Sequence, residues 1–294
     1  MDKDKIKQLA IVSGKGGTGK TTLAAAFAAI SRRKVIADCD VDAADLHLLL
    51  KPKILVQEKY FGGRSPHVDL DKCTQCGLCN DLCRFHAIDQ GRVDSVLCEG
   101  CGFCSHICPE DAIIMIDACS GDWFVSETLY GPFVHARLGI GEENSGKLVT
   151  VVRRKAVEIS EEKNLDLILI DGPPGIGCPV AASLTGVTLV LIVTEPTLSG
   201  IHDLERILKL SDHFRIPSLV CINKFDINSE ITQQMVSYSE KNGSKVIGKI
   251  PFEPKVVEAL VNRRTVLDYP CPQVGDVVFE MWNKVETLLE RGRP

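Results

Sequence analysis

Near its start the chain reads Ser13-Gly14-Lys15-Gly16-Gly17-Thr18-Gly19-Lys20-Thr21-Thr22, a glycine-rich sequence with one lysine near each end. The apolar run Leu9–Val12 precedes it, and the alanine-rich segment Leu23–Ile30 follows it. A strand, a glycine-rich turn and a helix in this order are the context that a GxxxxGK[ST] loop requires. Glycines let the backbone turn its N–H groups toward phosphate oxygens, and the helix N-terminus adds partial positive charge. The sequence therefore predicts a phosphate-binding loop.

Each residue of this loop has an expected role. We expect Lys20 to reach the β- and γ-phosphates and Thr21 to bind Mg²⁺. The backbone of the remaining residues is expected to surround the phosphates: Gly14, Lys15, Gly16, Gly17, Thr18, Gly19 and Thr22. A glycine-rich turn without a ligand is the alternative interpretation.

Strand-like and helix-like segments alternate along the rest of the chain. Further apolar strands are expected at 34–38, 165–170, 188–193, 218–222 and 246–250, and helices at 200–211, 230–242 and 254–262. This alternation predicts an α/β fold with a mainly parallel sheet covered on both faces, and ligands at the carboxyl ends of the strands. The amphipathic segment 277–289 carries glutamates and no polybasic face, so we expect it to pack on the core.

The loop resembles the variant P-loop of the MinD/ParA-type ATPases, whose relatives include Mrp-type cluster carriers and the nitrogenase iron protein. The resemblance covers roughly residues 6–52 and 148–265. It implies that Lys15 is a signature lysine that crosses a dimer interface to the partner's nucleotide. It also implies that Asp40 positions the attacking water and that Asp171, at the end of an apolar strand, is the switch II carboxylate. We expect Asp38, Asp42 and Asp45 to be solvated, helix-capping carboxylates.

The nucleotide base is expected to meet Asn223, because an Asn at this strand end reads the base in MinD-like proteins. The run Asn223-Lys224-Phe225-Asp226 also resembles the guanine-reading motif of GTPases. Since Lys15 belongs to an ATPase signature, the resemblance favours ATP with Mg²⁺ over GTP.

Cysteine is the outlier in the composition, with 13 residues, and eight of them lie between Cys73 and Cys108. The first residues show no apolar segment typical of a secretion signal, so metal ligation or redox chemistry is expected rather than disulfides. The spacing Cys-x₂-Cys-x₂-Cys-x₃-Cys occurs twice with an offset of 25 residues. This is the bacterial ferredoxin run, in which the fourth cysteine binds the other of two [4Fe–4S] clusters.

The crossed pattern assigns four cysteines to each cluster. Cluster 1 is expected on Cys73, Cys76, Cys79 and Cys108, and cluster 2 on Cys98, Cys101, Cys104 and Cys83. Structural zinc is the alternative, but zinc sites usually pair two CxxC units a dozen or more residues apart. The proline that follows the fourth cysteine is present as Pro109 but replaced by Arg84 in the first run. Outside the runs, Cys39 and Cys221 are expected to be buried, and Cys178 is a candidate for metal binding or redox sensing.

The cysteine runs lie in an insertion within the nucleotide fold. We expect a P-loop domain in two parts, 1–57 and 119–294, around a small α+β ferredoxin-like domain at 58–118. Residues 68–118 hold nine Asp/Glu and three Lys/Arg, a net charge of −6, whereas the whole chain carries −5. This negative charge would attract a basic redox partner, or it would merely keep the insert solvated. Segments 113–117 and 123–126 are expected to form a hairpin across Ser120-Gly121-Asp122, and 130–147 to be a connection.

This combination resembles the MinD-superfamily ATPases with an inserted ferredoxin domain. It suggests that ATP binding and hydrolysis gate electron transfer from two [4Fe–4S] clusters to an acceptor protein. ATP-dependent assembly of a metallocluster on a partner, and MinD-like positioning, are the alternatives. A homodimer or a heterodimer with a related ATPase is expected. The net charge of −5, and apolar runs far shorter than the ~20 residues of a membrane span, predict a cytoplasmic protein that binds neither nucleic acid nor membrane.

Overall fold

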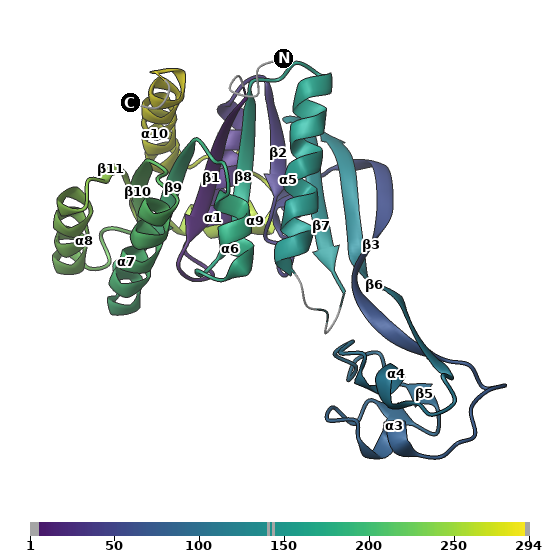
Figure 1. The fold of residues 1–294 in the computed structure, drawn as a ribbon. Coiled ribbons are helices and arrows are strands. Elements are labelled where there is room, and N and C mark those ends of the chain that lie inside the picture. Colours follow the sequence, from purple (N-terminus) through teal and green to yellow (C-terminus); the bar gives the residue numbers. More distant parts are fainter. Residues whose placement is uncertain (1–5, 140–141, 143–144, 292–294) are drawn as a thin grey trace.

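The computed structural model describes residues 6–139, 142 and 145–291. In this part of the chain a nine-stranded sheet has the order β11-β10-β9-β1-β8-β2-β7-β6-β3 (Figure 1). Its strands are β1 (Lys7–Ser13), β2 (Lys34–Asp38), β3 (Lys53–Val68), β6 (Ile113–Thr128), β7 (Gly131–Leu138), β8 (Leu167–Pro174), β9 (Leu189–Thr194), β10 (Ser218–Asn223) and β11 (Lys245–Ile250).

The sheet is mainly parallel, as the alternating sequence pattern predicts. All neighbours from β11 to β7 pair in parallel, while β6 pairs antiparallel with both β7 and β3. The inner strands are largely apolar and buried because helices cover both faces of the sheet. β1 lies between β8 and β9, so the loop after β1 emerges in the middle of the carboxyl edge.

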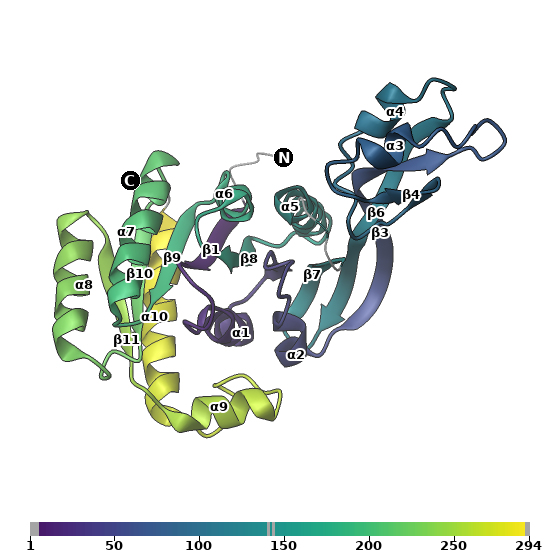
Figure 2. The same ribbon diagram turned by 90° about the horizontal axis from the view of Figure 1, so that it is seen from below.

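The helices divide between the two faces of the sheet (Figure 2). α1 (Lys20–Ile30), α2 (Leu46–Leu50), α9 (Pro254–Val261) and α10 (Pro272–Arg291) lie on one face. α5 (Ser145–Glu162), α6 (Cys178–Leu184) and α7 (Leu198–His213) cover the other face, and α8 (Ser229–Lys241) lies near the β11 edge. Two buried apolar clusters, one on each side, form the core.

The C-terminal helix packs on the core, as its sequence predicts. Val278, Met281 and Val285 of α10 are buried. The ring of Trp282 meets that of Phe27 on α1 edge to face, with centroids 5.2 Å apart. The apolar face of α10 therefore forms part of the hydrophobic core.

Two expectations about the middle of the chain are wrong. The expected hairpin around Ser120-Gly121-Asp122 is instead one continuous strand, β6. A Cβ on Gly121 would lie 2.5 Å from the carbonyl oxygen of Arg137, so this glycine permits the close approach of β7 and makes no turn. The expected connection at 130–147 contains β7, whose Phe133 and Val134 are buried, and the first residues of α5; residues 140, 141, 143 and 144 lie outside the described part.

The cysteine-rich segment projects from the sheet at the end of a two-stranded arm (Figure 1). β3 and β6 pair over their whole length, from Lys53 with Glu127 to Val68 with Ile113. Beyond them lie α3 (Leu78–Asp81), the small β4 (Ile88–Asp89) and β5 (Arg92–Val93) pair, and α4 (Phe103–Ile107). The expected domain boundaries at 57/58 and 118/119 fall within β3 and β6, so the insert shares its supporting strands with the central sheet.

Among the described helices, none is both long and apolar enough to cross a bilayer.

Candidate functional site

The glycine-rich loop joins β1 to α1 at the carboxyl edge of the sheet. Gly17 and Gly19 have φ angles of 79° and 94°, a left-handed region that glycine adopts without strain. A Cβ on Gly19 would also lie 2.4 Å from Nδ2 of Asn223. The loop therefore needs glycine at this position both for its backbone angle and for the approach of β10.

Asn223, the expected base-reading residue, contacts the loop itself. Its Nδ2 donates a hydrogen bond to the carbonyl oxygen of Thr18 at 2.8 Å, and its Oδ1 accepts one from the backbone N–H of Lys224 at 3.0 Å. These bonds fix the side chain at the end of β10 beside the loop. Recognition of the base by Asn223 stays a prediction.

A cavity of about 550 Å³ extends from this loop. Its polar end is lined by residues 16–22 of the loop together with Asp40, Asn223 and Lys224. Its other end is lined by apolar side chains of α9 and α10 and the segment between them, including Val256, Leu260, Val266 and Val274. A cavity with one polar and one apolar end suits a nucleotide.

Lys20 lies at the centre of a buried group of charges beneath this loop. Its Nζ is 2.9 Å from Oδ1 of Asp171 and 3.2 Å from Oδ2 of Asp40, and it also donates to Oγ1 of Thr21 at 3.3 Å. Burial lowers the pKa of Lys20, but Asp171 and Asp40 outweigh this effect and leave the pKa above its ordinary value. The structure thus brings together four residues that the sequence analysis assigned to nucleotide and magnesium chemistry.

Asp38 corrects one expectation, because it is not a solvated carboxylate. It ends β2, is fully buried, and pairs in register with Asp171 of β8. Its Oδ1 accepts a hydrogen bond from the backbone N–H of Asp40 at 3.0 Å, while its Oδ2 has no partner among the described residues. Burial, and then the charge of Asp171, raise its pKa. Asp42 and Asp45 are exposed, as expected, although Asp45 makes no capping bond with its side chain.

Two further buried oxygens at the site have no hydrogen-bond partner among the described residues. They are Oγ1 of Thr18 in the loop and Oδ2 of Asp171. Unpaired buried polar atoms are costly, and they are usually satisfied by a ligand, an ion or water. They are therefore consistent with a site that receives a phosphate group and its cation.

Lys15 points away from this cavity. Its Nζ forms an ion pair with Oε1 of Glu195 at 2.7 Å and hydrogen bonds with the hydroxyls of Thr197 and Ser199. The second carboxylate oxygen of Glu195 binds Nζ of Lys224 at 3.1 Å. The sequence analysis missed Glu195, although its place directly after a buried strand on the carboxyl edge is a usable signal.

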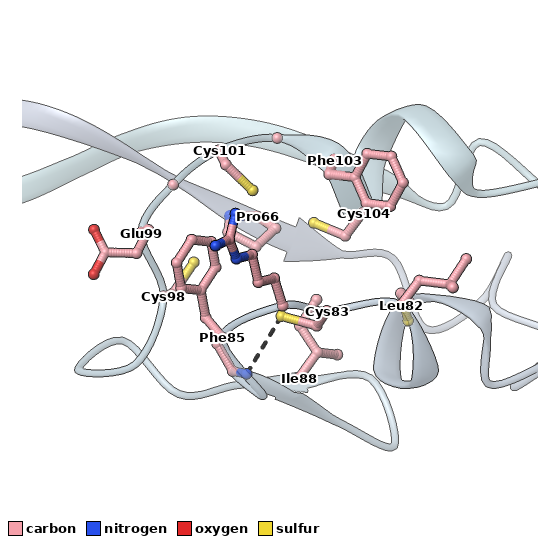
Figure 3. A pocket seen from close by; sticks show the side chains of 15 residues that line it. Pro66, Leu82, Cys83, Phe85, Ile88, Cys98, Glu99, Cys101, Phe103 and Cys104 are labelled. Carbon is pink, nitrogen blue, oxygen red and sulfur yellow. Dashed lines mark hydrogen bonds between the residues drawn. The ribbon is translucent and has the colours of Figure 1, made fainter.

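The eight cysteines of the insert line two cavities. One cavity, of about 370 Å³, is lined by Cys98, Cys101, Cys104 and Cys83, and also touches Cys79. The other, of about 410 Å³, is lined by Cys73, Cys76, Cys79 and Cys108. Both cavities thus combine three cysteines of one run with cysteine from the other run, one in the second cavity and two in the first. Figure 3 shows the first cavity, with its cysteines around one space and the carboxylate of Glu99 turned away from them.

Two of these sulfur atoms accept backbone hydrogen bonds in equivalent positions. Sγ of Cys83 accepts from the N–H of Ala87 at 3.4 Å, and Sγ of Cys108 from the N–H of Ala112 at 3.3 Å. The repeat in sequence is therefore also a repeat in structure. The cysteines surround a space rather than converge on a point, and within the described ranges no three His, Cys, Asp or Glu side chains could hold a single metal ion.

The other cysteines fall into two groups. Cys39 and Cys221 are buried, as expected, and burial raises the pKa of the Cys221 thiol to about 12. Cys271 is also buried, whereas Cys119 and Cys178 are exposed. Metal binding or redox sensing by Cys178 stays a prediction.

Comparison with known proteins agrees with this geometry. A family model for the CobQ/CobB/MinD/ParA nucleotide binding domain matches residues 9–266, most of the chain. The chain belongs to this family. The family is a nucleotide-binding one that includes MinD and ParA, and the glycine-rich loop lies within the matched residues.

Two uncharacterized proteins of Methanocaldococcus jannaschii are similar along most of their length. One is 33% identical over 290 residues, which cover 97% of this chain and 98% of the relative. The other is 27% identical over 265 residues, covering 89% of this chain and 91% of the relative. At 97% coverage, the first alignment includes the insert as well as the nucleotide-binding parts.

Solved structures share the fold at lower identity. MinD from Pyrococcus horikoshii in complex with Mg-ADP has a TM-score of 0.58 and 18% identity, covering 96% of this chain and 97% of that chain. The cell division ATPase MinD from Pyrococcus furiosus has a TM-score of 0.57 and 18% identity, covering 96% and 99%. McdA from Cyanothece, in a D38A variant with ATP, has a TM-score of 0.57 and 16% identity, covering 98% and 97%.

Proposed function

We propose that this protein is an ATP-hydrolysing switch that dimerises around its nucleotides and carries two [4Fe–4S] clusters, so that the nucleotide cycle controls electron transfer to a partner protein. One observation carries the proposal. The two cysteine cavities lie at the far end of β3 and β6, and these strands continue into the central sheet. The carboxyl edge of that sheet borders the cavity at the phosphate-binding loop, here called the nucleotide cavity.

The residues of the nucleotide cavity fit Mg-ATP. Lys20 would bind the terminal phosphates, and Thr21, next to the buried carboxylates, would bind Mg²⁺. Asp40 would position the attacking water, and Oδ2 of Asp171 is buried without a hydrogen-bond partner among the described residues. Lys15, which lies outside the lining of its own cavity among the described residues, would act on the nucleotide of a second copy.

The two cysteine cavities fit iron–sulfur cubes in their donor chemistry. A cube holds one thiolate on each of its four irons, so its ligands surround a space, as the cysteines do here. The backbone N–H groups of Ala87 and Ala112 donate to two of the sulfurs, an interaction that tunes such clusters. A bound cluster would supply one-electron chemistry.

A continuous set of strands connects the two sites. Asp40 follows β2, β2 pairs with β7, and β7 pairs with β6, which continues along the arm to Ile113 at the cysteine cavity. α2, which follows the Asp40 loop, carries His47, whose ring stacks on His135 of β7. If the loop between β2 and α2, which contains Asp40, rearranges on nucleotide binding or hydrolysis, it would therefore shift β7 and the part of β6 that pairs with it, at the base of the arm.

The cluster assignment has a direct test in the crossed ligands. We expect about eight irons per chain in anaerobically purified protein, and about four in either Cys83→Ser or Cys108→Ser. The loss in Cys108→Ser should fall on the cluster of Cys73, Cys76 and Cys79, and EPR spectra of the two variants should be complementary. Cys119→Ser, which changes a cysteine outside both cavities, is the matched control and should keep all its iron.

The coupling has a second test, in which the full protein is reduced and mixed with and without a non-hydrolysable ATP analogue. We expect nucleotide to change the cluster potential, the binding of the acceptor or the rate of electron transfer. If none of these changes, the proposed coupling is wrong. Transfer of iron, sulfide or another metal to the acceptor would instead support the assembly of a metallocluster.

Positioning is the second candidate function, and the similarity to MinD and McdA over nearly the whole chain favours it. Under this hypothesis the nucleotide-dependent dimer binds a surface or a partner, and the insert provides the contact. The solved structures that share the fold include a MinC:MinD cell division protein complex from Aquifex aeolicus. ATP-dependent sedimentation with liposomes, by a protein that retains no iron, would support positioning and contradict electron transfer.

A further inference from the structure

We infer that Glu195 holds Lys15 within its own subunit and thereby sets the threshold for nucleotide-dependent dimer formation. The inference rests on the proposed function, in which Lys15 crosses to the nucleotide of a second copy. Glu195 lies directly after β9, on the carboxyl edge of the sheet beside the phosphate-binding loop. It does not line the nucleotide cavity among the described residues, so its role is one of positioning.

Three oxygens of one short segment hold the ammonium group of Lys15. Nζ lies 2.7 Å from Oε1 of Glu195, 3.2 Å from Oγ1 of Thr197 and 3.3 Å from Oγ of Ser199. Thr197 also caps α7 by accepting from the N–H of Gly200, so the segment is fixed to a helix. Lys15 must leave all three oxygens before it can reach a phosphate on another chain.

A second lysine anchors the carboxylate of Glu195. Its Oε2 binds Nζ of Lys224 at 3.1 Å, while its side chain is only 16% exposed. Partial burial raises the pKa of Glu195, but the hydrogen bonds from Lys15 and Lys224 outweigh this and leave the pKa below its ordinary value. The carboxylate is therefore ionised at neutral pH and, with restricted access to water, less screened than a surface ion pair.

The competition is between two anions for one cation. In the monomer, Glu195 binds Lys15, and in the dimer the triphosphate of the partner subunit would bind it. Any interaction that favours the monomer alone weakens the dimer by the same free energy. A two-fold dimer forms from two chains, and the Lys15–Glu195 contact must break in each of them. The dimer dissociation constant therefore changes by the square of the factor that one contact contributes.

The test is the effect of Glu195→Gln on dimer formation. Sedimentation velocity of the full protein with saturating Mg-ATPγS measures the dimer Kd, and a fluorescent ATP analogue measures nucleotide affinity separately. We expect Glu195→Gln to lower the dimer Kd about four- to twenty-five-fold, because each copy of such a pair contributes about two- to fivefold. Glu195→Asp, which keeps the charge but shortens its reach, should fall between Glu195→Gln and wild type.

The matched control is Glu205→Gln on α7, which removes a partly exposed carboxylate that pairs with Lys209. Its dimer Kd should equal that of wild type. If Glu195→Gln binds the ATP analogue normally but dimerises like wild type or more weakly, this inference is wrong. If wild type binds the analogue but neither it nor Glu195→Gln dimerises, the proposed function itself is contradicted.

Discussion

At the scale of single residues, the decisive feature is an excess of negative charge around one lysine. Lys20 is the central cation, and Asp38, Asp40 and Asp171 all lie near it in a buried setting. Burial raises the pKa of both Asp38 and Asp40. Such an arrangement costs folding stability, and it is suited to a site that later receives Mg²⁺.

The first prediction concerns the cost of the Asp38 charge. Because folding raises the pKa of Asp38, its ionisation destabilises the native state above the ordinary carboxyl range and has no effect below it. We expect Asp38→Asn, without nucleotide, to raise the free energy of unfolding at pH 8 by about 1–2 kcal/mol. The amide keeps the acceptor for the N–H of Asp40, and the gain should shrink as the pH falls toward 4. Urea unfolding at several pH values measures it.

Asp42→Asn is the control for this prediction, because Asp42 is an exposed aspartate only four residues after Asp38. It should change the stability little at any pH. A loss of stability in Asp38→Asn at pH 8 would mean that the carboxylate of Asp38 is itself stabilising.

At the scale of elements, β7 joins the nucleotide site to the arm. Its His135 is buried in a stack of aromatic rings. The centroid of its ring lies 4.5 Å from that of Phe133, 4.8 Å from that of Phe124 on β6 and 6.3 Å from that of His47 on α2. The hydroxyl of Ser126 on β6 lies 3.1 Å from its Nε2. Burial, with a smaller effect of His47, lowers the pKa of His135 to about 4.

The second prediction follows from this lowered pKa. The unfolded chain binds a proton on His135 near pH 6.5, whereas the folded chain resists it until about pH 4. Stability is therefore fully present above pH 6.5 and is lost as the pH falls, by about 2 kcal/mol at pH 4.5. We expect His135→Phe, which keeps a ring in the stack, to remove this part of the pH dependence.

Other groups also titrate in this range, so the measurement compares slopes. Free energies of unfolding between pH 7 and 4.5 should fall less steeply in His135→Phe than in wild type. His67→Gln, at an exposed position on β3, should keep the slope of wild type. Equal slopes in His135→Phe and wild type would contradict the prediction.

The elements also mark where prediction from sequence succeeds and fails. The phosphate-binding loop and the cysteine runs were predictable because their residues are neighbours in the chain and their spacing reflects local chemistry. β6 was not, because Ser120-Gly121-Asp122 is a typical turn sequence, and only the carbonyl of Arg137 on the neighbouring strand explains its glycine. Asp38 was missed because aspartate is rarely buried, although it follows an apolar run of residues just as Asp171 does.

At the scale of the whole molecule, the cysteine-rich unit is supported by the arm. α3 and α4 contact each other, α4 contacts β6, and β5 contacts β3. Val68 and Ile113, the last paired residues of the arm, are direct partners in the antiparallel register. The unit between them therefore begins and ends at adjacent positions.

The third prediction is that the unit can be removed without unfolding the rest. We expect replacement of residues 69–112 by Asn-Gly, a two-residue hairpin turn, to leave a folded protein that binds ATP with wild-type affinity. It should contain no iron, whereas wild type should contain about eight irons per chain. Thermal unfolding, ATP titration and iron analysis measure the three properties.

The same protein with Gly-Gly in place of Asn-Gly controls for the choice of turn. An unfolded product with both turns would show that the nucleotide-binding part needs the insert for its core. Iron retained in either product would place a cluster outside the two cysteine cavities.

The long arm also has a mechanical consequence. β6 pairs with β7 only from Gly121 onward, so Ile113–Ser120 extends about 25 Å beyond that pairing, with β3 beside it. A rotation of the arm by one degree at its root would therefore move its tip by about half an ångström. Under the proposed function, hydrolysis would thus reposition the cysteine-rich unit against a docked acceptor through a small rotation at the root of the arm.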